Sequence, residues 1–229
     1  MERHFEQELK ELKEHLLLMG GRAEAIVRKS IDALRRRDPI VAQQVFEDDR
    51  AIDRLEIDIE ESCLRLLALQ QPLATDLRFI TAALKISNDL ERVGDHAVNI
   101  AGGALRLAGK PMLKPLVDIP RMAEVAIGML NQALDDFVRR DGESARQLVR
   151  RDDEVDDLNR QVFRELLSYM IEDPSTITRA LELVLVARNL ERIADLATNV
   201  AEEVVFIAEA RIIKHHADES ASGDDFARG

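Results

Sequence analysis

The chain has 229 residues, and it is poor in aromatic side chains and in cysteine. It contains no tryptophan, aromatic residues make up 3% of it, and Cys63 is its one cysteine. A single cysteine excludes a disulfide framework within the chain and a cysteine-based zinc site. The scarcity of aromatic rings also removes the stacking platforms with which proteins hold single-stranded nucleic acid.

Positive charge is likewise in short supply. Lysine and arginine number 32 against 44 aspartates and glutamates, which gives a net charge of −12. Phosphate backbones and anionic lipid surfaces are bound by basic proteins, so this balance argues against nucleic acid and membrane-surface partners. The excess of carboxylates instead suits a cation ligand.

Long apolar runs are missing too. No stretch approaches the ~20 apolar residues that a bilayer-spanning helix needs. The first residues, Met1–Phe5, are too charged for a secretory signal peptide. The sequence therefore predicts a cytoplasmic protein without membrane insertion.

What the chain does contain is typical of helical bundles. Apolar residues reach 46% and charged residues 33%, with 10 glycines and 6 prolines. Apolar side chains recur at 3.6-residue spacing, and breaker residues such as Asp38-Pro39 and Gln71-Pro72 interrupt them. The pattern predicts an all-α chain of six long antiparallel helices, at about 2–36, 39–70, 75–107, 118–140, 143–171 and 176–213.

The proline-rich stretch 111–120 is the longest interruption, so we place the joint between two halves there. The halves repeat one order of elements, which predicts two tandem, pseudo-symmetric three-helix bundles at 1–112 and 113–213. Residues 214–229 are polar and small, and we expect a disordered tail.

One motif is written twice. Asp89–Asn99 recurs as Asn189–Asn199, and in both copies Glu, Asp and Asn follow one another at intervals of four. On a helix, positions i, i+4 and i+8 lie along one face. The helix that precedes each copy carries a second pair of carboxylates at i, i+4, and we expect the pairs to face the motif. The candidate metal ligands are Asp49, Asp53, Glu91, Asp95 and Asn99 in the first half, and Asp152, Asp156, Glu191, Asp195 and Asn199 in the second.

Like charges at i, i+4 repel each other by a few tenths of a kcal/mol on a helix surface, so two such rows favour a neutralising cation. Carboxylate and amide oxygens suit Mg²⁺, Mn²⁺, Fe or Ca²⁺ better than a thiolate-seeking metal. A single row would be more typical of a solvated helix face, and its duplication is what favours a site. The second copy departs from the first at Asn159 and Arg188, so we expect the halves to differ.

Three further side chains receive other interpretations. Arg92 and Arg192 lie off the acidic face, and we expect them to form salt bridges between helices. His96 has no counterpart in the second copy, where Leu196 stands, so we interpret it as incidental to a metal site. His215 and the histidine after it fall in the tail.

Motifs for catalysis are missing from the sequence. No Glu-x-x-His occurs, as in di-iron bundles, and there is no glycine-rich phosphate loop and no Gly-x-Ser-x-Gly. The sequence predicts a protein that is not an enzyme. Two alternatives stay open, namely a carboxylate-bridged metal enzyme, for which the rows would have to be buried, and a metal-free helical scaffold.

Several segments together resemble the PhoU family of phosphate-uptake regulators. They are Met19-Gly20, Gln71–Arg78, Ala83–Ile86 and Asp89–Asp95 in the first half, with Asp153–Asp156 and Asn189–Asp195 in the second. The resemblance implies tandem three-helix bundles with iron or zinc clusters at the acidic residues named above. It also implies a homodimeric, non-enzymatic negative regulator of the phosphate-starvation response. Its partners would be a PstB-type ATPase of the phosphate ABC transporter and a PhoR-type sensor histidine kinase.

Overall fold

The protein is a bundle of long helices in a computed structural model that describes residues 2–149 and 151–210, with side chains left undescribed at 2, 3 and 152. The described part contains no strand, which confirms the all-α class. Its elements are α1 (Glu2–Arg36), α2 (Pro39–Gln70), α3 (Ala74–Ala108), α4 (Asp118–Arg139), α5 (Gly142–Val149), α6 (Asp152–Glu172), the 3₁₀ helix η1 (Pro174–Thr176) and α7 (Ile177–Glu209). The expected tail and the end of the sixth predicted helix lie outside the described residues.

The helices begin and end at the breaker residues that the sequence analysis identified. The Asp38 side chain accepts hydrogen bonds from the backbone N–H groups of Ile40 and Val41, at 2.8 and 3.2 Å, and Pro39 opens α2. At the other end of α2, Gln71 adopts a left-handed conformation with φ 47°. Such a residue ends a helix, because it turns the chain away from the helical path.

The fifth predicted helix, 143–171, is divided into α5 and α6, so the prediction of one continuous helix was wrong there. Arg151 forms a turn in which its N–H bonds to the Leu148 carbonyl at 2.9 Å and its own carbonyl accepts from Glu154. The sequence around it reads basic, basic, acidic, acidic over 150–153. Cations are favourable at a helix C-terminus and anions at an N-terminus, so this order suits one helix ending and another beginning.

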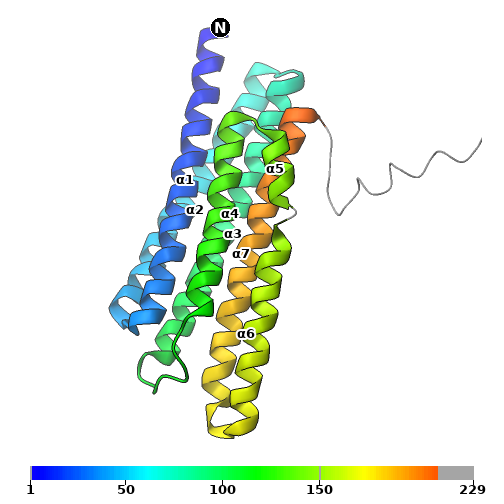
Figure 1. Cartoon of the computed structure of the whole chain (residues 1–229). Helices are drawn as coiled ribbons and strands as arrows, with labels where there is room; N and C mark the ends of the chain where they lie inside the picture. The colour runs from blue at the N-terminus through cyan, green and yellow to red at the C-terminus, as the bar shows by residue number, and fades with distance from the viewer. Residues whose placement is uncertain (1, 150, 211–229) are drawn as a thin grey trace, which may run out of the picture.

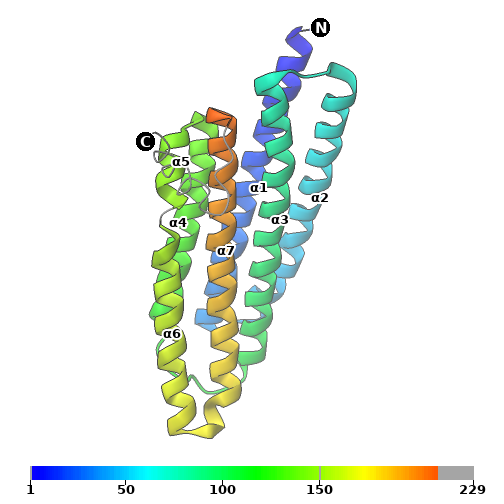
Figure 2. The ribbon, with the colours of Figure 1, turned by 90° about the vertical axis from the view of Figure 1, so that its right-hand side faces the viewer.

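Two bundles lie side by side, α1–α3 in one and α4–α7 in the other (Figure 1). The central helices α3 and α7 run antiparallel and form the main contact between them (Figure 2). Consequently the α2–α3 turn and the α6–α7 turn lie at opposite ends of the molecule. The two tandem bundles agree with the predicted fold, while the domain limits at 112 and 113 stay a prediction.

Both apolar side chains and ion pairs join the bundles. The Phe79 and Phe137 rings stack with centroids 5.4 Å apart, between α3 and α4. Lys85 on α3 donates to the buried Glu203 carboxylate on α7 at 3.0 Å. None of the helices in the described part of the chain combines the length and apolar character needed to cross a bilayer.

Candidate functional site

Five carboxylates from the middle of α2 and α3 form one group on the outer side of the first bundle. We call them the first acidic cluster: Asp49, Asp53, Glu56, Glu91 and Asp95. Their proximity is plain from the electrostatics of Glu91. Burial, followed by the charges of Asp95, Glu56, Asp53 and Asp49 in that order, raises the pKa of Glu91 to about 7. The predicted facing of the two helices' carboxylates is therefore present in this half.

Gly94 sets how closely α2 approaches α3 at this cluster. It is buried, and a Cβ atom placed on it would lie 2.6 Å from Oδ1 of Asp49 and 3.3 Å from Cδ1 of Ile52. The missing side chain thus makes room for the Asp49 carboxylate against α3. That position is costly for a charge, since burial, followed by the nearby Asp53 and Asp95, raises the pKa of Asp49 to about 6.

The cluster faces outward rather than into the bundle core. Asp53 and Asp95 are exposed, and Asp49, Glu56 and Glu91 are half-buried. Asn88 extends the cluster by donating from Nδ2 to Oε1 of Glu56 at 3.4 Å. Glu56 was not among the predicted ligands, although its place three residues after Asp53 puts it on the same helical face and marks it in the sequence.

An oxygen-only donor set of this kind fits a hard cation. It offers no nitrogen or sulfur ligand, which iron, manganese and magnesium tolerate more readily than zinc in a structural site. Within the described ranges, however, no group of three or more His, Cys, Asp and Glu side chains is arranged so that it could hold a metal ion. Side chains of the cluster would have to rotate toward a common point to bind one.

Asn99, the predicted amide ligand, is exposed on α3 one turn after Asp95. It lines a groove of about 600 Å³ that runs from Phe46 on α2 across α3 to α7. Gly102 and Gly103 of α3 and Leu185 of α7 also line this groove. Asn99 thus borders the groove between the bundles, and its role as a ligand stays a prediction.

In the second repeat, two of the matching carboxylates pair with arginines of their own helices. Asp156 lies 3.7 Å from Arg160 one turn on, and Asp195 lies 2.8 Å from Arg192. Glu191 and Asn199 are half-buried, and the side chain of Asp152 is outside the described part. In the first repeat the carboxylates lie close to one another, whereas in the second repeat two of them form ion pairs with arginines.

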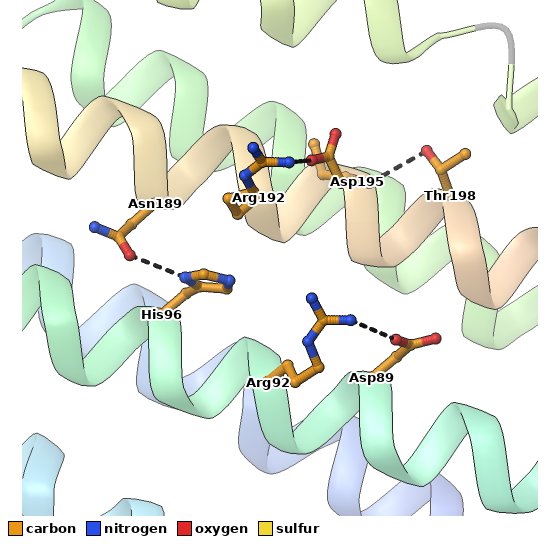
Figure 3. A network of polar contacts seen from close by, with 8 residues as sticks. Asp89, Arg92, His96, Asn189, Arg192, Asp195 and Thr198 are labelled. Atoms are coloured by element: carbon orange, nitrogen blue, oxygen red, sulfur yellow. Dashed lines mark hydrogen bonds and ion pairs between the residues drawn. The ribbon is translucent and has the colours of Figure 1, made fainter.

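Figure 3 shows the polar side chains where α3 and α7 meet. Arg92 pairs with Asp89 at 3.5 Å and Arg192 with Asp195, each within its own helix, so the predicted inter-helix salt bridges were wrong. His96 provides a link across the bundles instead. Its Nδ1 lies 2.9 Å from Oδ1 of Asn189, and because that oxygen can only accept, the ring N–H donates.

Comparison with known families gives a match in both halves. The family model for the PhoU domain matches residues 16–103 and again residues 119–204. The two matches lie on either side of the predicted joint. Together they account for most of the chain and for both copies of the repeated motif.

Individual relatives agree with that match. The chain is 44% identical over 209 residues to a phosphate-specific transport system accessory protein PhoU homolog of Aquifex aeolicus, covering 91% of this chain and 95% of that one. A homolog of the same description from Caulobacter vibrioides is 45% identical over 201 residues, with 87% of each chain covered. Among solved structures, PhoU from Pseudomonas aeruginosa superposes with a TM-score of 0.87 at 38% identity, covering 90% of this chain and 100% of that one.

Proposed function

The chain belongs to the PhoU family, and from that premise we propose that it is an accessory regulator of phosphate uptake that represses the phosphate-starvation response. In this proposal it acts in the cytoplasm as a homodimeric adaptor. It contacts a PstB-type ATPase of the phosphate ABC transporter and a PhoR-type sensor histidine kinase. The observation that carries the proposal is the match of both repeats to relatives named as accessory proteins of the phosphate-specific transport system.

The position of the first acidic cluster supports contact rather than catalysis. Its carboxylates lie on an outer helical face, with Asp53 and Asp95 exposed. A carboxylate-bridged metal enzyme would hold such residues around an enclosed substrate pocket. An exposed charged face is better suited to meeting a partner or a cation from solvent.

We further propose that the first acidic cluster binds metal, with iron, manganese or magnesium favoured by its oxygen donors. Burial, and after it the repulsion between neighbouring carboxylates, raises the pKa of Asp49 and Glu91, and a cation would relieve that repulsion. Asp49, Asp53, Glu91 and Asp95 would hold the ion, with Glu56 beside them. When bound, the metal would neutralise the face and change what it can recognise.

A deletion strain tests the adaptor role. Without the protein, a phosphate-starvation reporter should be active in high phosphate, and the wild-type gene should restore repression. Repression that persists in the deletion strain would refute the proposal.

Complementation with Glu91→Ala, together with metal analysis of the purified wild type and variant, tests the cluster. Wild-type protein without metal, in cells whose reporter is repressed, would favour the metal-free scaffold.

A further inference from the structure

The end of the α6–α7 hairpin exposes a line of large apolar side chains on each helix. On α6 these are Phe163 at 49% exposure, Leu167 at 41% and Ile171 at 75%; on α7 they are Ile177 at 41%, Leu181 at 49% and Leu185 at 49%. We call these six residues the hairpin face. Single exposed apolar residues are ordinary on protein surfaces, whereas a contiguous set marks an interaction site.

The spacing makes the set contiguous. Within each helix the three residues follow at i, i+4 and i+8, so they form a line along one side of it. The two helices lie side by side and run in opposite directions from the turn at η1 (Figure 2). Counting outward from that turn places Ile171 level with Ile177 and Leu167 level with Leu181. Each line also stands one residue after buried positions, Val162 and Leu166 on α6 and Ala180 on α7. In antiparallel neighbours the same step along the chain turns toward the same outer side, so the two lines form one apolar strip over two helices.

Arginines border this strip. Arg164 and Arg188 are exposed, and among the described residues their side chains make no hydrogen bond or ion pair. The carboxylates within the same segments are already occupied, because Glu165 pairs with Lys114 and Glu182 accepts from Arg106 at 2.7 Å. In a chain of net charge −12, the end of the strip away from the turn is therefore locally basic, while exposed Glu172 and Asp173 lie at the turn.

The first repeat carries a large apolar side chain at two of the six matching places, Leu64 for Leu167 and Leu77 for Ile177. Counted from the acidic pairs on the second helices, Phe163 and Arg164 correspond to Glu60 and Glu61. Counted from the repeated motif, Leu181 corresponds to Thr81 and Arg188 to Asn88. The other four places hold Glu60, Ala68, Thr81 and Lys85, so the first bundle packs without a continuous line of large apolar side chains there.

We propose that the hairpin face binds an acidic amphipathic helix of a partner protein. Two adjacent helices offer a shallow apolar groove into which the apolar side of a third helix can settle, as in helix-in-groove recognition. The unpaired arginines then select a partner whose flanks carry carboxylates. The inference deepens the proposed adaptor function, on which it rests, by giving one contact surface and the chemistry of its partner.

The charge pattern favours this occupant over two others. A second copy of the chain is itself strongly acidic. In a two-fold symmetric contact, moreover, its hairpin face would bring arginines against the arginines of the first copy. An anionic membrane would suit the arginines locally, yet the remainder of the molecule would be repelled by it. An acidic helix contacts only the apolar strip and its arginines, whereas a membrane or a second copy would bring an extended anionic surface near the rest of the chain.

The test uses the full chain and two labelled synthetic helices of about 15 residues. Both peptides carry leucines at helical spacing; one has glutamates at the remaining positions and the other lysines. We expect fluorescence anisotropy to show binding of the glutamate peptide and binding of the lysine peptide about tenfold weaker or worse. Leu167→Glu, and separately the pair Arg164→Glu with Arg188→Glu, should each weaken the glutamate peptide about tenfold, or ~1.4 kcal/mol.

The matched control is Leu64→Glu. Leu64 is 54% exposed on α2 and stands at the place in the first repeat that corresponds to Leu167. This variant should bind the glutamate peptide as the wild type does, and circular dichroism should show all variants folded. The inference is overturned if neither peptide binds, if the lysine peptide binds equally well, or if Leu64→Glu weakens binding as much as Leu167→Glu.

Two further measurements assign the face to another occupant if the inference is wrong. Sedimentation with phosphatidylglycerol vesicles that is lost in Leu167→Glu would make it a membrane contact. Concentration-dependent self-association lost in the same variant would make it a contact between copies. Failure of the adaptor function is distinguishable from all of these, because it appears as normal repression in the deletion strain whatever the peptides do.

Discussion

The two repeats agree inside and differ outside. Leu90 and Leu190 are both fully buried, as are Ala97 and Ala197. On the outer faces, Glu60 stands where Phe163 stands in the second repeat, and Asn88 where Arg188 stands. Side chains that fill the bundle have been kept, whereas some that meet solvent have changed chemical character.

This difference separates the requirements of the fold from those of recognition. A helical bundle needs apolar residues at the spacing that faces its core, and both repeats provide them. Outer positions tolerate many residues, with surface changes altering stability by about 0.5 kcal/mol or less. One duplicated unit can therefore present an acidic face in its first copy and an apolar, basic face in its second without losing its packing.

The largest expected effect tests the shared interior. Leu90→Ala and Leu190→Ala should each lower the free energy of unfolding by about 2–5 kcal/mol, because both remove a fully buried side chain and leave a cavity. Urea unfolding followed by circular dichroism measures the loss. If the repeats have equivalent cores, the two losses agree within about 1 kcal/mol; a near-neutral Leu190→Ala would show that the second bundle packs more loosely.

A smaller effect is expected from the acidic cluster when pH changes. Glu91 has its pKa raised from 4.5 to about 7, so between these values the folded chain holds a proton that the unfolded chain has released. The free energy of unfolding of the metal-free protein should consequently fall as pH rises from about 4.5 to 7, and then level off. Glu91→Gln should flatten that fall and leave the variant more stable than the wild type near pH 8.

Chelator-treated protein and urea titrations at several pH values make this measurement. Asp49→Asn is the companion variant, since the pKa of Asp49 is raised to about 6, and it should flatten the lower part of the same pH range. Equal pH dependence in the wild type and in Glu91→Gln would contradict the crowding of charges in the first acidic cluster. Such a result would make the two repeats alike in this respect.

The sequence was sufficient for the fold because helical periodicity and strong breakers are local. Asp38-Pro39 and Gln71-Pro72 end and start helices through backbone chemistry that needs no partner. The break at Arg151 was missed because neither proline nor glycine marks it. The break follows two basic and then two acidic residues, and such charged residues are common on any surface helix, so they did not stand out in the sequence.

The site was only partly predictable for a related reason. Helical spacing places Asp49 and Asp53 on one face, and the repeat indicated that this face meets Glu91 and Asp95. Whether Arg192 would reach another helix or its own Asp195 depends on side-chain rotamers and neighbouring helices, which spacing does not determine. The hydrogen bond of His96 could not be predicted, because its partner Asn189 belongs to the other bundle and is a neighbour only through the contact of α3 with α7.

The smallest effect expected concerns that contact. His96→Leu gives the first repeat the residue of the second and removes the hydrogen bond to Asn189. Because both side chains reach solvent, water can replace the lost partner, and we expect a cost of about 0.5–1.5 kcal/mol. Asn189→Ala should cost a similar amount, and the double variant should cost less than the two single losses together, because they remove one shared interaction. Urea unfolding of the four proteins measures the coupling. Fully additive losses would mean that His96 and Asn189 do not join the two repeats in solution.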